Sequence, residues 1–214
     1  RKGFVFVGMD YSQIELRIMA DISQDNLLIE DFVDGLDIHK ATASRIMGKE
    51  MEDVTKEERS LGKTVNFGIL FGQTAYGLSS MLGIDVEKAS EYIQSYFSHY
   101  LGVEEYIRSL EKEAYKRGYV QSILGTTRFI QGLKSRNIRM IKAAQREAVN
   151  MPIQGSEADI MKLAMISMDE TIEEEFKGKA YILLQIHDEL IFEVKEDLSE
   201  TFALRAKETM EEII

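Results

Sequence analysis

The stretch Phe4-Val-Phe-Val-Gly-Met-Asp10 is a short apolar run that ends in a carboxylate, and Tyr181-Ile-Leu-Leu-Gln-Ile-His-Asp188 has the same form near the other end of the chain. The β-branched and aromatic residues of both runs favour strands. We therefore expect two strands of one sheet that bring Asp10 and Asp188 to a single site. Two carboxylates can bridge a pair of divalent cations, and Mg²⁺ prefers such oxygen ligands.

Each of these acids also has a simpler explanation. Asp10 could cap the helix that follows it, and Asp188 could occupy a tight turn between two strands. Glu189 adds a neighbouring acid, which favours a metal site over two unrelated structural roles. The main-chain carbonyl of Tyr11 would complete the protein ligands, because Mg²⁺ keeps several of its waters.

A four-residue repeat lies between the two acids. Arg59, Lys63, Phe67 and Phe71 are spaced so that they follow one side of an α-helix. The two cations could hold phosphates while the two rings cover a nucleobase. The alternative is a pair of core phenylalanines beside two solvated cations.

Three glycines, Gly62, Gly68 and Gly72, lie in or next to the same segment. An interior glycine costs a helix about 1 kcal/mol relative to alanine. We expect these glycines to make room for a ligand or template, and Gly72 to end the helix.

The composition is that of an ordinary globular protein. The 214 residues are 44% hydrophobic, and no apolar stretch reaches the roughly 18 residues that span a bilayer. Neither membrane insertion nor secretion is therefore expected, which favours a cytoplasmic location. With no cysteine, a metal site would need oxygen ligands or the three histidines.

The net charge of −11 argues against a polyanionic partner, but the charges are unevenly distributed. Residues 114–146 contain no Asp or Glu and carry eight cations. Such a run is either a solvated helix face or a surface that meets nucleic acid.

The expected fold is α+β, with strands near both ends in one sheet and helices between them. A loop or short hairpin is expected around Tyr119 to Gly132, and capping boxes at Ser12 to Glu15 and Thr55 to Glu58 predict two helix starts. Residues 1–20 and 151–214 would form the sheet-bearing unit, and residues 21–150 a helical insert. Further helices are expected near 24–33, 37–47, 74–82, 85–98, 103–117, 137–150 and 155–175, and from Leu198.

Several other polar residues have two interpretations. His39 could be an ordinary helix-start histidine or a phosphate ligand. Arg146, Asn150 and Gln154 recur every four residues. They could read minor-groove base edges, or they could simply face solvent. We expect Pro152 to interrupt this helix.

Three segments occur in a fixed order: Asp10-Tyr-Ser-Gln-Ile-Glu-Leu-Arg17, Arg59-x3-Lys63-x6-Leu70-Phe-Gly72 and Gln185-Ile-His-Asp-Glu189, the last preceded by Asn150-Met-Pro-Ile-Gln-Gly155. They resemble motifs A, B and C of the family A DNA polymerases. The resemblance covers nearly the whole chain. It implies a location in a bacterial nucleoid or a phage-infected cell, with an organelle as an alternative. It implies the antiparallel palm and the mostly helical fingers of a right-hand polymerase, without the thumb, as a piece of a longer protein.

The resemblance implies roles for individual residues. Asp10, Asp188 and the Tyr11 carbonyl would bind two Mg²⁺ ions, which Mn²⁺ could replace, with Glu189 beside them in the catalytic site. An incoming dNTP would meet Arg59, Lys63, Phe67, Phe71, His39, Gln13 and Glu15, the last as a steric gate against a ribose 2′-hydroxyl. Primer-template DNA would meet Arg146, Asn150, Gln154, His187 and Arg128.

The chain also departs from the family pattern. The family usually has Tyr where this chain has Phe71, and that hydroxyl is expected to bond Glu15. We therefore expect weaker discrimination against ribonucleotides. The loop Gly125-Thr-Thr-Arg-Phe-Ile-Gln-Gly132 lacks the extra arginines and the proline common there, which leaves Arg128 as its candidate DNA contact.

The expected reaction is template-directed transfer of deoxynucleoside monophosphate from a dNTP to a primer 3′-hydroxyl. The thumb and N-terminal domains of the same polypeptide would take part, so the isolated piece should be inactive or nearly so. A phage-type RNA polymerase shares the two aspartates but has no counterpart of Glu15 and Glu189. A non-catalytic polynucleotide-binding module is disfavoured by the intact acid pair, and a two-metal nuclease has no need of the Arg59, Lys63 and Phe67 face.

Overall fold

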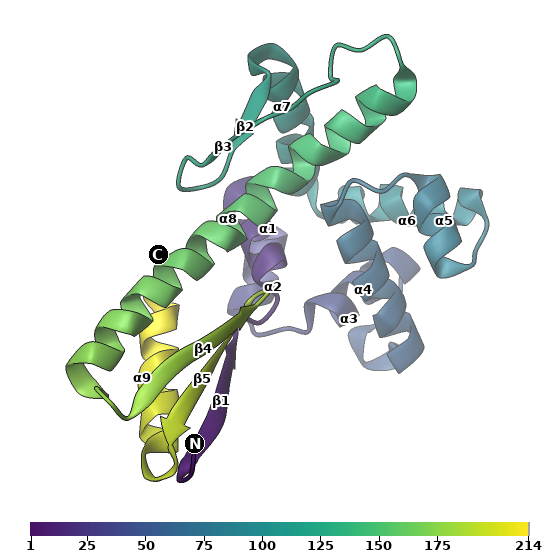
Figure 1. Cartoon of the computed structure of the whole chain (residues 1–214). Helices are drawn as coiled ribbons and strands as arrows, with labels where there is room; N and C mark the ends of the chain where they lie inside the picture. The colour runs from purple at the N-terminus through teal and green to yellow at the C-terminus, as the bar shows by residue number, and fades with distance from the viewer. Residues whose placement is uncertain (214) are drawn as a thin grey trace. The chain divides into compact units, whose positions relative to one another are not determined.

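The computed structural model describes residues 1–213, which divide into two compact units (Figure 1). Unit 1 consists of Arg1–Ile14 together with the chain from Ser156 onward, and unit 2 consists of Glu15–Gly155. The sequence places the corresponding boundaries near residues 20 and 150. Unit 2 is therefore an insertion within unit 1.

Unit 1 contains a three-stranded antiparallel sheet in the order β1-β5-β4. β1 (Phe4–Asp10) pairs with β5 (Glu189–Lys195), which also pairs with β4 (Ala180–Ile186). The register sets Asp10 opposite Glu189, which is the first residue of β5. Asp188 lies in the short turn between β4 and β5, at the same end of the sheet as Asp10.

Helices cover one face of this sheet. α9 (Ser199–Glu211) contributes Phe202 to a core that also contains Phe192 of β5 and Phe176. The Phe202 ring meets the other two edge-on, with centroid separations of 5.0 and 5.2 Å. Figure 1 shows α9 beside the strands.

β1 is an edge strand of this sheet, and only one of its faces packs against the core. Val7 and Met9 pack against the core, whereas Phe6 is 74% exposed. This alternation arises because successive side chains of a strand point to opposite faces of the sheet.

Unit 2 is mainly helical and contains a short hairpin. β2 (Tyr119–Gln121) pairs with β3 (Thr127–Phe129), which confirms the expected hairpin. Short 3-10 turns at Met51–Asp53 and, in unit 1, Glu196–Leu198 precede two of the helices. The remaining helices are α1 (Ile14–Ser23), α2 (Asn26–Val33), α3 (Ile38–Met47), α4 (Lys56–Leu70), α5 (Ala75–Leu82), α6 (Val86–His99), α7 (Leu101–Arg117) and α8 (Ile138–Glu175), which continues into unit 1.

Side chains at the helix starts explain where several helices begin. The predicted capping box of Thr55 and Glu58 is confirmed, with N–H···O distances of 3.2 and 2.9 Å. Gly72, with a φ of 63°, follows α4 and ends it as predicted. Three aspartates each accept a hydrogen bond from the backbone N–H three residues further on: Asp25, Asp37 and Asp85.

α8 is one continuous helix of 38 residues, which corrects the predicted break at Pro152. A proline inside a helix removes a backbone donor and crowds the preceding turn, at a cost of about 3 kcal/mol. Ala148, Val149 and Ile153 are buried around it. We attribute the continuity of the helix to this packing, which outweighs the local preference of proline.

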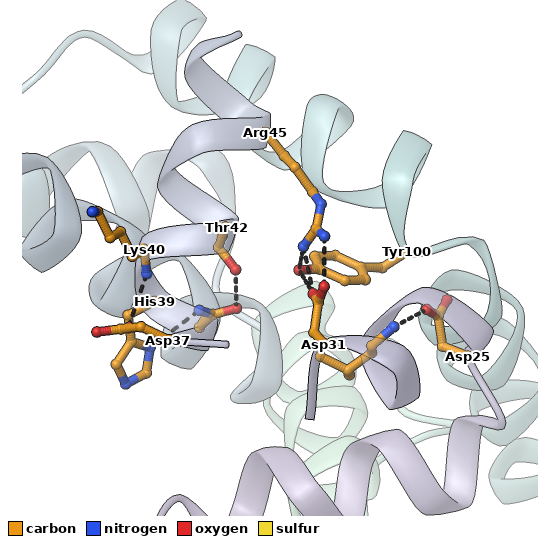
Figure 2. A network of polar contacts seen from close by, with 10 residues as sticks. Asp25, Asp31, Asp37, His39, Lys40, Thr42, Arg45 and Tyr100 are labelled. Atoms are coloured by element: carbon orange, nitrogen blue, oxygen red, sulfur yellow. Dashed lines mark hydrogen bonds and ion pairs between the residues drawn. The ribbon is translucent and has the colours of Figure 1, made fainter. Parts of the chain in front are cut away.

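A buried polar network joins α2 and α3 to the residue before α7 (Figure 2). Arg45 donates to both carboxylate oxygens of Asp31, at 2.5 and 2.6 Å, and to the hydroxyl of Tyr100 at 2.5 Å. Asp31 is 2% exposed and Tyr100 is fully buried. Because the buried charges are paired and hydrogen-bonded, the network fixes the helices without leaving an isolated ion inside.

Two glycines of α4 serve packing within unit 2, which corrects the expectation that they make room for a ligand. A Cβ atom on Gly62 would clash with the main-chain carbonyl oxygen of His39 and would lie 3.0 Å from the Cβ of Ala43. A Cβ atom on Gly68 would lie 3.2 Å from a methyl group of Leu78. Gly62 therefore allows α3 and α4 to approach closely.

Gly62→Ala should lower the free energy of unfolding by about 1 to 3 kcal/mol, because the added methyl group overpacks the contact between α3 and α4. Gly68→Ala is the matched control. It brings a similar gain in helix propensity, but its Cβ meets the flexible end of Leu78 instead of a carbonyl group. Urea denaturation measures both variants, and equal stability of the two would contradict the packing role of Gly62.

Candidate functional site

Asp10 and Asp188 lie at one end of the sheet in unit 1. The backbone N–H of Tyr11 donates to the carbonyl oxygen of Asp188 at 3.1 Å and ties the two segments together. The partial desolvation of its carboxylate raises the pKa of Asp10, and the charge of Asp188 raises it further. The two carboxylates are therefore close enough to repel each other, and a cation between them would relieve that repulsion.

Hydrogen bonds to main-chain carbonyl oxygens hold the segments beside the acid pair in place. The hydroxyl of Tyr11 donates to the carbonyl oxygen of Met210 in α9 at 2.6 Å, and burial raises the pKa of Tyr11 to about 12. His187 has a φ of 53°, and its carbonyl oxygen accepts a hydrogen bond of 2.8 Å from the side chain of Gln185. These contacts fix the backbone on both sides of the acids.

Two glutamates also lie near the acid pair. Glu189 stands opposite Asp10, and its carboxylate occupies the space that a Cβ atom on Gly8 would need. Glu157 of α8 was not predicted: burial raises its pKa, and the charge of Asp188 raises it further. The sequence could not reveal Glu157, because the side of α8 that faces the sheet is decided by packing.

The acid pair is suited to a hard divalent cation, although residues 1–213 hold no group of three or more His, Cys, Asp or Glu side chains placed to bind a metal. Asp10 and Asp188 supply oxygen donors, and Asp10 is exposed, which leaves room for the waters that Mg²⁺ retains. The repulsion between the two carboxylates favours a cation there. The donor chemistry therefore fits the expected metal.

In unit 2, the four-residue repeat of α4 lies beside α3. The rings of Phe67 and Phe71 stack with their centroids 5.9 Å apart and an interplanar angle of 19°. The ammonium group of Lys63 and the ring of His39 each lie 5.9 Å from the centroid of the Phe67 ring. We name His39, Arg59, Lys63, Phe67 and Phe71 the α3–α4 cluster, and the structure brings these predicted residues together.

Arg59 takes part in an ion pair at the start of α3. Its Nε donates to Oδ2 of Asp37 at 2.5 Å, and both side chains are at least one third exposed. Burial raises the pKa of Asp37, but the hydrogen bonds from Arg59 and from the backbone N–H of Lys40 outweigh it, so the pKa is lowered. An anion that binds Arg59 must compete with Asp37, in a partly exposed pair that contributes little to stability.

His39 is 4% exposed, and its Nδ1 lies 3.2 Å from Nδ2 of Asn66 (Figure 2). Burial lowers the pKa of His39, and the charges of Arg59 and Lys63 lower it further, against the opposing effect of Asp37. The ring is therefore neutral at pH 7.

The start of α1 holds two predicted nucleotide contacts. α1 begins at Ile14, so Gln13, with a φ of 56°, is the residue directly before the helix, one position later than the predicted cap at Ser12. Gln13 belongs to unit 1, and the half-buried Glu15 belongs to unit 2. The gate role of Glu15 and the nucleotide contact of Gln13 stay predictions.

α8 carries Arg146, Asn150 and Gln154 on one unbroken helix, so their four-residue spacing continues through Pro152. A Cβ atom on Gly72 would lie 3.3 Å from Cγ of Arg146, which places Arg146 beside the end of α4. The Oδ1 atom of Asn150 is buried, and no residue in the described part of the chain donates a hydrogen bond to it. This amide oxygen therefore retains an unused capacity to accept a hydrogen bond.

Acids that flank the acid-free run of residues 114–146 neutralise part of it. Arg117 pairs with Glu113 at 2.7 Å, and Arg128 pairs with Glu147 at 3.0 Å. The predicted DNA contact Arg128 is therefore paired in this structure. Fewer of the cations in this run are therefore available to bind an anion than the sequence suggests.

The sequence of residues 1–214 matches the family model for DNA polymerase family A. The chain belongs to DNA polymerase family A. This family A chain is 44% identical over 205 residues to DNA polymerase I of Geobacillus stearothermophilus, and 41% identical over 199 residues to DNA polymerase I of Pseudomonas aeruginosa. The matches cover 96% and 93% of this chain, but only 23% and 22% of those relatives.

A solved structure agrees with this membership. The POL domain of Pol1 from M. smegmatis, in complex with DNA primer-template and dNTP, matches with a TM-score of 0.94 and 41% identity. The match covers 100% of the family A chain and 38% of the solved chain. The α+β polymerase fold is thus confirmed, and no helix within residues 1–213 is long and apolar enough to cross a membrane.

His39→Gln should make the free energy of unfolding depend less steeply on pH on the acidic side of neutrality. The pKa of His39 is lower in the folded chain than the ordinary value of 6.5, so the unfolded chain binds the proton first as the pH falls. The stability that neutral His39 contributes is complete above about pH 6.5 and is lost as the pH falls towards the folded pKa. Urea unfolding at a series of pH values measures the slope, with the exposed His99→Gln as control; an unchanged slope for His39→Gln would contradict the lowered pKa.

Proposed function

We propose that this chain forms the palm and fingers of a DNA-directed DNA polymerase, which transfers deoxynucleoside monophosphate from a dNTP to a primer 3′-hydroxyl. One combination supports the proposal: a family A chain with an acid pair in unit 1 and the α3–α4 cluster in unit 2. Residues 1–20 and 151–214 would belong to the palm and residues 21–150 to the fingers. A thumb and N-terminal domains would come from other parts of the polypeptide.

Asp10 and Asp188 would hold two Mg²⁺ ions, or Mn²⁺ in their place, together with the carbonyl oxygen of Tyr11. Such ions lower the pKa of the attacking hydroxyl and stabilise charge on the leaving pyrophosphate. The chain's own contribution is placement: the pairing of β1 with β5 and the hydrogen bond from Tyr11 to Asp188 hold both acids at one end of the sheet. Glu189 would support them from the opposite strand.

The α3–α4 cluster would receive the triphosphate. Arg59 and Lys63 would offer charged donors to the phosphate oxygens, with Arg59 exchanging Asp37 for phosphate. Phe67 and Phe71 present stacked rings to the base and sugar. Gln13 and Glu15 would contact the sugar side of the nucleotide, Glu15 as the gate.

Primer-template DNA would meet polar side chains of both units. The M. smegmatis relative was solved with a DNA primer-template, which supports this partner. The unpaired acceptor of Asn150 would suit a donor on a base edge. Arg146, Gln154, His187 and Arg128 complete the proposed set, and Arg128 would have to leave Glu147 to reach a phosphate.

Asp188→Ala, in the full polymerase that contains this chain, should reduce primer extension by at least about a hundredfold, because losing a metal ligand removes several kcal/mol of transition-state stabilisation. Primer-template binding, followed by fluorescence anisotropy, should persist. Asp197→Asn, an exposed acid of the same unit, is the control. Retained extension by Asp188→Ala would refute the metal role.

Phe71→Tyr should improve selection of deoxynucleotides over ribonucleotides by roughly threefold to tenfold, the worth of one hydrogen bond from the new hydroxyl to the gate glutamate. Single-nucleotide incorporation of each dNTP and its matching ribonucleotide gives the ratio. Phe129→Tyr adds the same hydroxyl to an exposed ring of the β2–β3 hairpin and serves as the control. If the ratio stays the same in Phe71→Tyr, the gate explanation is wrong.

A further inference from the structure

Asn66 of α4 is fully buried, and the two ends of its amide have different partners in α3. Oδ1 accepts a hydrogen bond of 3.0 Å from the hydroxyl of Thr42, which is also fully buried. Nδ2 lies 3.2 Å from Nδ1 of His39. Figure 2 shows the side chains of these two partners, Thr42 and His39.

This orientation decides where the proton of His39 lies. An amide nitrogen can only donate, so Nδ1 of His39 must accept from Asn66. A neutral imidazole carries a single proton, which then lies on Nε2. The two ring nitrogens are separated by a carbon atom, so the Nε2–H group points away from Asn66.

The tautomer of His39 decides whether the ring can donate a hydrogen bond to a phosphate oxygen. His39 packs against Phe67, and the charges of Arg59 and Lys63 act on it. In the opposite tautomer Nε2 would present a lone pair, which repels a phosphate oxygen. With the proton on Nε2, the same atom is a hydrogen-bond donor.

We propose that Asn66 is a positioning residue for nucleotide binding: it holds His39 as the Nε2–H tautomer, so that the ring donates to an oxygen of the incoming triphosphate. Thr42 acts one step further back by fixing the direction of the amide. This inference rests on the proposed function, because the triphosphate is its ligand. Asn66 acts on the nucleotide only through the histidine and does not take part in the chemistry.

Nitrogen NMR of ¹⁵N-histidine-labelled protein tests the tautomer directly. In the full-length protein, at a pH where His39 is neutral, its Nδ1 should give a pyridine-like signal and its Nε2 a pyrrole-like signal, assigned by comparison with His39→Gln. His99 is an internal contrast, because its Nδ1 lies 2.8 Å from the carbonyl oxygen of Ser95 and should carry the proton. A protonated Nδ1 in neutral His39 would overturn the inference.

Asn66→Asp is the decisive variant, because a carboxylate of nearly the same shape can only accept and should draw the proton onto Nδ1. The KM for dATP opposite template thymine should rise about tenfold, the effect of one hydrogen bond to a charged group, while kcat changes little. Asn66→Asp combined with His39→Gln should be no worse than His39→Gln alone. Unchanged ring signals in Asn66→Asp, or additive effects in the double variant, would overturn the inference.

Thr42→Val and Thr42→Ser provide a second route if Asn66→Asp does not fold. Thr42→Val removes the hydroxyl that orients the amide and should give a mixture of the two tautomers, whereas Thr42→Ser keeps the hydroxyl and should restore the Nε2–H form. If Thr42→Val and Thr42→Ser gave the same ring signals, the proposed action of Thr42 on His39 through Asn66 would be overturned. Failure of the polymerase proposal is read separately, from primer extension by Asp188→Ala, which does not depend on the ring.

Discussion

The closeness of α3 to α4 depends on Gly62, where the carbonyl oxygen of His39 lies against the bare Cα of the glycine. At this separation His39 reaches Asn66, and Asp37 at the start of α3 reaches Arg59. The α3–α4 cluster is therefore a product of helix packing as much as of the four-residue repeat within α4. Even a methyl group at this contact would disturb the ring, the ion pair and the amide together.

Two of the cations that we assign to nucleotide and DNA binding are paired with carboxylates in the protein. Arg59 pairs with Asp37, and Arg128 pairs with Glu147, and all four side chains are at least one third exposed. Exposed pairs contribute little free energy, so exchanging the carboxylate for a phosphate costs little. The buried Arg45–Asp31 pair is different, because breaking it would leave a charge without solvent, which suits a structural role.

The local structural features, which depend on residues close together in the sequence, were predicted from the sequence. The capping box of Thr55, the hairpin after Tyr119 and the one-sided repeat of α4 were all readable, because each arises within a few positions. Packing between side chains decided the features that the sequence did not predict. Pro152 stays inside a helix, and the approach of Asn66 to His39 joins residues 27 positions apart, which no local pattern can show.

β1 and β5 pair although they lie at opposite ends of the chain. A ribosome releases β1 first, and β5 follows about 180 residues later, which is roughly ten seconds or more at ordinary rates of synthesis. The contacts within the α3–α4 cluster, in contrast, join residues 37 to 71. During translation the helical insertion can therefore become ordered while the strand that ends in Asp10 is still unpaired, and the acid pair cannot assemble until β5 has been made.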